Sequence, residues 1–565
     1  MAKRDTLGSD HVAGDEGPEH DEPRGRRPVP GTASRTPVGA VLWEPPARRV
    51  AEASVTRFRG WLAEEHGLPL AGSAALQDWS VTEPGRFWDL LWEFCAVEGD
   101  RGDGPPLTGA GMTGTHWFPS ARVNYAENAL TRHGAAPGII AVREDGATAV
   151  VSWDELRRQV ARAAAGLRRL GIGPGDRVAA VVPNTAHAVI AMLATASIGA
   201  VWASCPPDAA PEGLADRFAP ITPRVLIGVD GYTRGGQVFD SLEPLAHLAR
   251  RLPNLAATVV IPYLTSDALG RAAEVGVPAL RSWDDLLAVE EELVFARLPF
   301  DAPLWILFTT EAGGQPRPVV HGHGGILLEH LKSLAMHLDL GPDDRLCWQA
   351  TTGEVMWHYL VSGLLTGTTI VLYDGSPAHP DLSILWRLTE AIEVTCLGLA
   401  AAFVEACRDS GLVPAALADL SLLRTVGAFG APFAPDAAAW VYEAVSPSVA
   451  FTPMSGSAEL GTALILALPT EPVRAGEAGP TLGCAVRVTD RADTGGELVV
   501  TAPLPSMPVF VWGDPTGAWL YQTRLGRFPG WWWQRERARA TAAGAFAVGD
   551  VAFPALIPSG LRPGP

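Results

Sequence analysis

The chain has 565 residues, which is enough for several domains and rules out a small domain stabilised mainly by disulfides. Its 44 basic and 62 acidic residues give a net charge of −18, which excludes a basic surface for nucleic acids or anionic membranes. A hydrophobic share of 47% with 19% charged residues excludes a disordered chain, so we expect a folded protein that binds neither nucleic acid nor membrane.

The first 38 residues predict a flexible tail. Residues 1–38 contain no Phe, Trp or Tyr and mix acidic and basic clusters with Pro and Gly, so they cannot bury enough surface to fold. They also lack the apolar core of a secretion signal. The six cysteines lie far apart without a CxxC pair, which fits neither a disulfide framework nor a thiolate zinc site. We therefore expect a cytoplasmic protein.

Patterns of apolar and turn residues divide the rest of the chain into four parts. Residues 39–110 are rich in Trp and Phe and predict an aromatic cap packed on a larger body. Residues 111–430 alternate short apolar strands with helices, whereas residues 431–530 hold shorter strands interrupted by Gly and Pro. Residues 531–565 lose this alternation. The sequence thus predicts an α/β body, a smaller β-rich subdomain and an atypical short tail.

The body has the pattern of a parallel sheet covered by helices. Its strongest helix signal is the capping box at Ser152, followed by apolar residues at spacings of three and four. A strand at 178–182, a small-residue helix from Ala186 and a strand at 200–203 form a βαβ unit. The stretch 186–205 is also the most membrane-like, but its Ala, Ser and Thr content favours a buried helix and strand. We expect an α/β fold with stacked, mostly parallel sheets, and further strands at 304–308, 369–373 and 394–397.

A glycine-rich segment follows one of the predicted buried strands. Thr309, Thr310, Gly313 and Gly314 precede the cation Arg317, an arrangement that aims backbone N–H groups and a positive charge at phosphate oxygens. An ordinary glycine-rich turn has the same composition. The segment alone therefore leaves both interpretations open.

Longer motifs decide in favour of phosphate chemistry, because they resemble those of the adenylate-forming acyl-CoA synthetases over about residues 41–530. These motifs are Trp117-Phe118-Pro119, Asn124-Tyr125-Ala126-Glu127-Asn128, Val201-Trp202-Ala203-Ser204-Cys205, Val229-Asp230-Gly231-Tyr232, His321-Gly322-His323-Gly324-Gly325, Leu372-Tyr373-Asp374-Gly375-Ser376-Pro377 and Pro503-Leu504-Pro505-Ser506-Met507-Pro508-Val509. The resemblance implies the N-terminal body of that fold. It also implies a two-step reaction, in which ATP and a short acyl or 3-keto acid give an acyl-adenylate that then passes to coenzyme A, with Mg²⁺ as cofactor.

The resemblance also implies roles for individual residues. A carboxylate must approach a phosphate, so the site needs positive potential where charge gathers. By their match to the family motifs, Glu459 would bind Mg²⁺, and Glu459 and Arg317 would be the catalytic residues. The nucleotide would be bound by Thr309, Thr310, Gly313, Gly314, Gly427, Gly430, Ser455 and Glu536. The acyl pocket would be lined by Thr351, Gly353, Met356 and Trp357.

The sequence departs from the family pattern in the phosphate loop. Glu311-Ala312-Gly313-Gly314 stands where the family has Gly-Thr-Thr-Gly, which removes two hydroxyls and adds a carboxylate beside the expected triphosphate. Two like charges at about 4 Å and an effective dielectric near 20 repel by roughly 4 kcal/mol. Arg317 replaces the loop lysine, and Ala458 replaces a threonine of the acidic turn. We expect these changes to weaken ATP binding.

The C-terminal end departs as well. Glu536 is the only acidic residue near the offset of the family's ribose-binding aspartate. Beyond it the hinge and the mobile C-terminal lid are not matched, so we expect the lid to be missing or supplied by a separate chain. The chain has only two lysines, Lys3 and Lys332, and Lys332 is expected on the polar side of a helix, where it could not replace the catalytic lysine of the lid.

Several residues have a structural alternative to their functional interpretation. His321 and His323 could bind a metal but lack a third ligand nearby, and Trp531–Trp533 could be a stacking platform or pack on the body. Glu459 could be a Mg²⁺ ligand or a solvated turn acid. Cys205 could be a nucleophile but is more typical of a core cysteine, and Thr351–Trp357 could line a pocket or belong to the core.

Two functions remain open at this stage. The first is an adenylate-forming ligase that acts on a short acyl or 3-keto acid. The second is a non-catalytic homologue that keeps the fold to bind a ligand or partner. The changed loop favours the second, whereas the family motifs favour the first.

Overall fold

The computed structural model describes residues 36–309, 316–430, 434–489 and 495–551. Across these ranges no helix is long and apolar enough to cross a membrane. The stretch considered as a span is helix α7 (Ala186–Ser197) followed by strand β9 (Val201–Cys205), as the βαβ pattern predicts.

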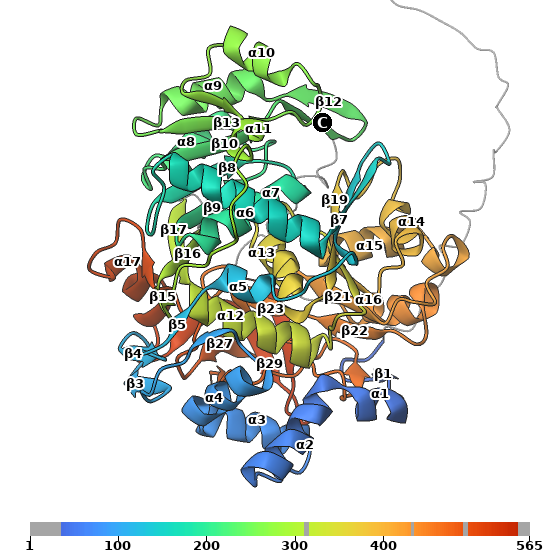
Figure 1. Ribbon diagram of the computed structural model, residues 1–565. Helices are drawn as coiled ribbons and strands as arrows, with labels where there is room; N and C mark the ends of the chain where they lie inside the picture. The colour runs from blue at the N-terminus through green and yellow to red at the C-terminus, as the bar shows by residue number, and fades with distance from the viewer. Residues whose placement is uncertain (1–35, 310–315, 431–433, 490–494, 552–565) are drawn as a thin grey trace, which may run out of the picture. The chain divides into compact units, whose positions relative to one another are not determined.

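Two large sheets form the α/β body (Figure 1). In the first sheet all strands run in the same direction except β17, which pairs antiparallel with both of its neighbours; the order is β14 (Leu280–Ser282), β13 (Ala257–Ile261), β10 (Val225–Val229), β8 (Arg177–Val181), β9, β16 (Pro303–Thr309), β17 (Arg317–Gly322) and β28 (Phe510–Val511). The second is parallel except for its final strand and has the order β22 (Ala450–Pro453), β21 (Thr425–Phe429), β20 (Cys396–Ala400), β18 (Arg345–Trp348), β19 (Thr369–Asp374), β6 (Pro137–Arg143) and β7 (Thr148–Ser152). The expected α/β class with stacked, mostly parallel sheets is therefore confirmed, and the strand expected at 394–397 lies at Cys396–Ala400.

The sheets and helices alternate in layers. The largest buried core contains apolar residues of both sheets together with α6 (Trp153–Arg169), α7 and α12 (His323–Leu331). A second core lies against the second sheet and includes α14 (Ile384–Ala391) and α15 (Ala401–Asp409), and a third covers the first sheet with α8 (Pro211–Phe218) and α9 (Leu242–Arg250). This stacking buries both faces of each parallel sheet, which explains why the strands are almost entirely apolar.

The helix α6 begins where the capping pattern predicts. The Ser152 side chain accepts a hydrogen bond from the Glu155 N–H at 3.2 Å. Leu156, Val160 and Leu167 follow on the buried face of the helix. The cap satisfies one free N–H of the first turn, and the apolar stripe fixes which side of the helix faces the core.

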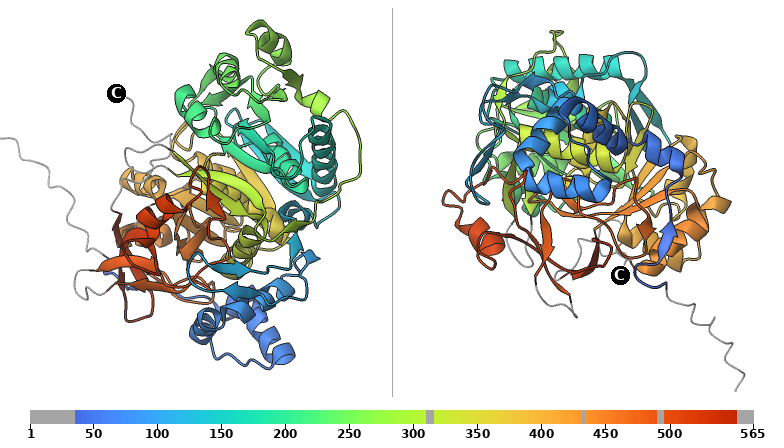
Figure 2. Two further views of the ribbon diagram at one scale, coloured as in Figure 1. Left: turned by 90° about the vertical axis from the view of Figure 1, so that its left-hand side faces the viewer. Right: turned by 90° about the horizontal axis from the view of Figure 1, so that it is seen from below.

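The aromatic N-terminal region forms helices that cover the body. Helices α2 (Ser54–His66), α3 (Ser73–Thr82) and α4 (Pro84–Phe94) lie over α12 in the view from below (Figure 2). Phe87 and Leu91, which the spacing places on one face of α4, are fully buried.

The prediction that Lys332 lies on the polar side of a helix is wrong. Its side chain is fully buried, with Nζ 2.6 Å from Glu329 Oε2 and 3.3 Å from Thr481 Oγ1. The ammonium also lies 5.5 Å from the ring centre of Trp88. Because Lys332–His337 is a π-helix covered by the N-terminal helices, the periodicity of α12 does not extend to Lys332.

A four-stranded antiparallel sheet follows the body. Its order is β26 (Val486–Val488), β27 (Gly496–Val500), β29 (Trp532–Ala540) and β30 (Phe546–Val551). The pairing of β27 with β29 continues past residue 530, where a change to an atypical tail was expected. Trp532 is almost fully buried in the core beneath this sheet, as the packing interpretation expects, whereas Trp531 is exposed.

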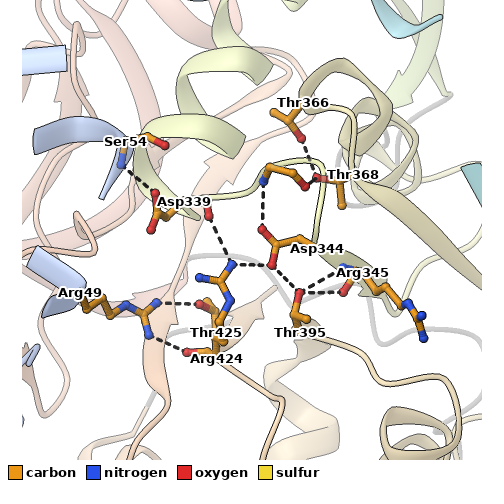
Figure 3. Close-up of polar contacts among 11 residues, drawn as sticks. Arg49, Ser54, Asp339, Asp344, Arg345, Thr366, Thr368, Thr395, Arg424 and Thr425 are labelled. Atoms are coloured by element: carbon orange, nitrogen blue, oxygen red, sulfur yellow. Dashed lines mark hydrogen bonds and ion pairs between the residues drawn. The ribbon is translucent and has the colours of Figure 1, made fainter. Parts of the chain in front are cut away.

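A polar network ties the amino ends of three neighbouring strands in the second sheet (Figure 3). Asp344 precedes β18, Thr395 precedes β20 and Arg424 precedes β21; Asp344 accepts from Thr395 Oγ1 at 2.7 Å and forms an ion pair with Arg424. Arg49 of helix α1 (Ala47–Glu52) donates to the Arg424 carbonyl at 2.9 Å. Asp339 accepts from the Ser54 N–H at 2.8 Å. These contacts lie at the edge opposite to the one where ligands bind in parallel sheets.

Candidate functional site

A cavity lies where strands of the two sheets end. It holds about 810 Å³ of empty space, counting the part open to solvent. Asn184 follows β8, Pro206 follows β9, Gln349 follows β18 and Gly375 follows β19, and all four residues line the cavity. Carboxyl ends of parallel strands are the usual place of ligand binding in open α/β sheets, so this cavity is a candidate substrate site.

One of the four predicted pocket residues lines the cavity. Thr351 is part of its wall, whereas Gly353, Met356 and Trp357 are not. The Trp357 ring is fully buried, and its Nε1–H donates to Asn184 Oδ1 at 2.9 Å. Trp357 therefore lies outside the cavity and holds the side chain of Asn184, which lines it, in place.

Acidic side chains dominate the charge of this cavity. Its charged lining residues are Arg234 against Asp208, Glu354 and Asp374, and Arg234 Nε lies 3.9 Å from Asp208 Oδ2. Burial raises the pKa of Glu354, although Thr351 donates to its carboxylate at 3.1 Å. Burial likewise raises the pKa of Asp374 to about 6. Glu354 and Asp374 therefore take up a proton at a higher pH than ordinary carboxylates do.

The raised pKa of Asp374 predicts a pH-dependent stability. The pKa of Asp374 rises from 3.8 to about 6 on folding, so the folded state binds this proton more tightly than the unfolded state does. The free energy of unfolding therefore falls as the pH rises from about 4 to about 6 and Asp374 loses its proton. Asp374→Asn removes the effect. Between about pH 4 and 7, the free energy of unfolding of the variant should rise relative to that of the wild type by up to about 3 kcal/mol, as measured by urea unfolding. Parallel pH profiles of the two proteins would contradict this.

A second group of polar side chains forms around Glu459. Thr309, the last residue of β16, donates to Glu459 Oε1 at 3.0 Å. The same oxygen forms an ion pair with Arg524. Glu459 is only 4% exposed, so the alternative of a solvated turn acid is wrong. Burial alone would raise the pKa of Glu459. The charge of Arg524, together with hydrogen bonds from Arg524, Thr309 and the Glu459 backbone N–H, holds the pKa below its ordinary value.

Ser455 and Glu536 form the other half of this polar group. Ser455 lies on β23 (Ser455–Ser457) and donates to Glu536 Oε2 on β29. Gly456 fits this place because a Cβ there would lie 2.2 Å from the Thr462 carbonyl oxygen. Burial raises the pKa of Glu536, and both Arg524 and Glu459 act on it electrostatically. The structure therefore brings together four predicted residues, which we call the Glu459 cluster: Thr309, Ser455, Glu459 and Glu536, with Arg524 as a fifth member.

Two buried histidines hold the turn that carries Glu459. His321 Nε2–H donates to the Ala458 carbonyl at 2.9 Å, and His330 Nε2–H donates to the Gly461 carbonyl at 2.8 Å. Burial lowers the pKa of each histidine to about 4, so both rings are neutral. His323 accepts from the backbone N–H of Tyr125. His321 and His323 thus have separate structural partners, and the described residues contain no group of three or more metal-binding side chains.

The remaining predicted positions differ in their surroundings. Gly427 lies under Trp348, since a Cβ at Gly427 would come within 2.7 Å of the indole ring, so this glycine makes room for a core tryptophan. Gly430 has a φ of +92° and open space beside its Cα. Arg317 is exposed and pairs in register with Thr309. The other predicted loop residues, Thr310, Gly313 and Gly314, lie outside the described residues, as do Glu311, Ala312, Ala431 and Pro432.

Sequence patterns missed Arg524, which lies 65 residues from Glu459. It belongs to the π-helix Tyr521–Leu525, and its guanidinium lies 5.8 Å from the ring centre of Trp532. No local motif marks it. The aromatic run that contains Trp532 was the one available signal.

Comparisons with known proteins show which family the chain resembles over most of its length. Residues 127–507 match the family model described as AMP-binding enzyme. An acetoacetyl-coenzyme A synthetase of Rhizobium meliloti (strain 1021) is 39% identical over 93% of this chain and 81% of the relative. A malonamoyl-CoA synthetase of Penicillium aethiopicum is 32% identical over 87% of this chain and 71% of the relative.

A solved structure extends the similarity to three dimensions. The acetoacetyl-CoA synthetase from Streptomyces lividans has a TM-score of 0.86 and 41% sequence identity, covering 91% of this chain and 80% of that one. These comparisons support neither the expectation that the lid is missing nor a separate chain that supplies it. With the family model matching most of the chain and relatives above 30% identity covering most of its length, this protein belongs to the AMP-binding enzyme family.

Proposed function

We propose that this chain is an acetoacetyl-CoA synthetase-like ligase, which activates a short 3-keto acid with ATP and transfers the acyl group to coenzyme A. Its membership of the AMP-binding family and its 39% identity to the Rhizobium enzyme support an ATP-dependent acyl-CoA ligase. The observation that carries the proposal is the convergence of Thr309, Ser455, Glu459 and Glu536 from segments far apart in the sequence. The family resemblance assigns all four residues to the nucleotide, and their meeting in the structure supports that assignment.

In the first step, a carboxylate oxygen of the acid attacks the α-phosphorus of ATP, and pyrophosphate leaves with its electron pair. In the second, the thiolate of coenzyme A attacks the acyl carbon and AMP leaves. Glu536 and Ser455 would hold the ribose, and Gly430 would lie beside the adenine. Thr309, Arg317 and Arg524 would face the phosphates, where positive charge and hydrogen-bond donors stabilise the transferred group. The acid would occupy the cavity lined by residues such as Thr351.

The residues around Glu459 do not fit a Mg²⁺ site. Protein carboxylates that bind Mg²⁺ supply a free, negatively charged oxygen, whereas Glu459 Oε1 already accepts from Thr309 and pairs with the buried guanidinium of Arg524. The hydroxyl of Ser455 is likewise engaged by Glu536. We therefore assign no step of the reaction to a metal at Glu459.

The second candidate is a non-catalytic homologue that binds a nucleotide without turnover. One observation favours it, because the Arg524 ion pair neutralises the carboxylate that the family resemblance assigns to catalysis. The proposed division into a cap at 39–110, a body at 111–430 and a β-rich part after 430 is the same for both candidates.

Acid-dependent exchange of pyrophosphate into ATP separates the two candidates. A ligase should show exchange with acetoacetate well above that without acid, and Thr309→Val should lower it about tenfold, since a hydrogen bond to a charged group is lost. Thr366→Val at the opposite edge of the second sheet is the matched control and should leave exchange unchanged (Figure 3). No exchange, together with a melting temperature raised by AMP, would establish the non-catalytic homologue.

A further inference from the structure

The Arg524 guanidinium is a buried cation whose hydrogen-bonding capacity is only partly used. Its side chain is 8% exposed, and one terminal nitrogen forms the ion pair with Glu459. Its Nε has no hydrogen-bond partner among the described residues. A buried donor without a partner is uncommon in folded proteins and calls for an acceptor. The Trp532 ring, 5.8 Å away, limits the positions the guanidinium can adopt.

The nearby acidic groups already share one buried cation, Arg524. Glu459 and Glu536 are the two carboxylates of the cluster, and Arg524 acts on both. A divalent cation that took the place of Arg524 at Glu459 Oε1 would leave a buried guanidinium without a counter-charge. Removing one partner of a buried ion pair is strongly unfavourable.

We propose that Arg524 replaces a divalent cation at Glu459 and presents its free Nε–H to the phosphate of a bound nucleotide. A guanidinium suits this role because its rigid, planar donors match phosphate oxygens and its charge does not depend on pH. Nucleotide binding at this site is then independent of metal ions. The phosphate contact rests on the proposed function, whereas the exclusion of metal from Glu459 does not.

Titrating the full chain with Mn²⁺, in the absence of nucleotide, tests whether a divalent cation binds at Glu459. The wild type should show no bound Mn²⁺ by electron paramagnetic resonance and no change in melting temperature. Arg524→Gln should melt at a lower temperature and recover part of the loss with Mn²⁺, because the ion then compensates Glu459. The double variant Glu459→Gln with Arg524→Gln should melt independently of Mn²⁺.

Two results would overturn the proposal. The first is that the wild type binds Mn²⁺ and Glu459→Gln does not. The second is that Arg524→Gln folds but its melting temperature does not change with Mn²⁺. If Arg524→Gln does not fold, the wild-type titration still decides, and Arg524→Lys, which keeps the charge, should match the wild type.

AMP tests the phosphate contact separately. Its affinity for the wild type should be the same within about twofold in Mg²⁺ and in EDTA, and Arg524→Gln should weaken it about tenfold, by loss of a charge-assisted hydrogen bond. A strong Mg²⁺ requirement in the wild type would contradict the contact. A wild type that binds no AMP would instead count against the proposed function, while the Mn²⁺ result would stand.

Discussion

Replacing Lys332 with methionine is expected to lower the free energy of unfolding by about 3–5 kcal/mol. Lys332 and Glu329 are both fully buried, and Nζ lies 2.6 Å from Glu329 Oε2. Thr462 Oγ1 donates to the same carboxylate oxygen at 3.1 Å, so Glu329 stays buried when the ammonium is removed. An isolated buried carboxylate must then either remain charged at high cost or take up a proton.

A paired substitution provides the control. Lys332→Met with Glu329→Gln removes both charges and should recover most of the lost stability, because a buried ion pair contributes little over neutral groups of similar size. Urea unfolding of the wild type and both variants measures the difference. A Lys332→Met protein within about 1 kcal/mol of the wild type would show that water reaches this pair.

Replacing Glu311 with glycine and Ala312 with threonine is expected to raise ATP affinity, by up to about a thousandfold. The limit follows from roughly 4 kcal/mol of repulsion between a carboxylate and a phosphate charge at about 4 Å. AMP should gain less than ATP, because it lacks the outer phosphates. Adding Arg317→Lys should increase affinity less than the first two changes do. Calorimetric titration with each nucleotide gives the affinities.

Glu311→Gln separates the charge from the shape of the loop. If repulsion is the cause, this change should give most of the gain that the double variant gives. An unchanged ATP affinity in both variants would show that Glu311 does not oppose the triphosphate.

Local patterns predicted most of the body but failed where distant segments meet. The cap at Ser152 and the apolar strands depend on neighbouring residues, so their signals are contained in short windows. Lys332 was misplaced because Trp88 and Thr481, both far away in sequence, bury it. The packing of Gly427 under Trp348 could not be predicted either, because this contact crosses between strands.

The candidate site shows the same division. Ser455, Glu459 and Glu536 could be named from motifs, since the family resemblance fixes their places in the sequence. Arg524 could not be found, because its role depends on the fold bringing a π-helix against a turn 65 residues away. The ion pair it forms also changes the chemistry assigned to Glu459, from a metal ligand to the partner of a guanidinium.

Nucleotide binding at the Glu459 cluster is tested most directly by calorimetric titration of AMP into Glu536→Gln. The matched control is Asp339→Asn, a carboxylate-to-amide change at the opposite edge of the second sheet, where asparagine tolerates the φ of 54° and can still accept from Ser54 (Figure 3). We predict that Glu536→Gln weakens AMP binding about tenfold or more, through loss of a charged acceptor for the ribose hydroxyls, while the control matches the wild type. Equal affinities in all three proteins would contradict a nucleotide site at this cluster.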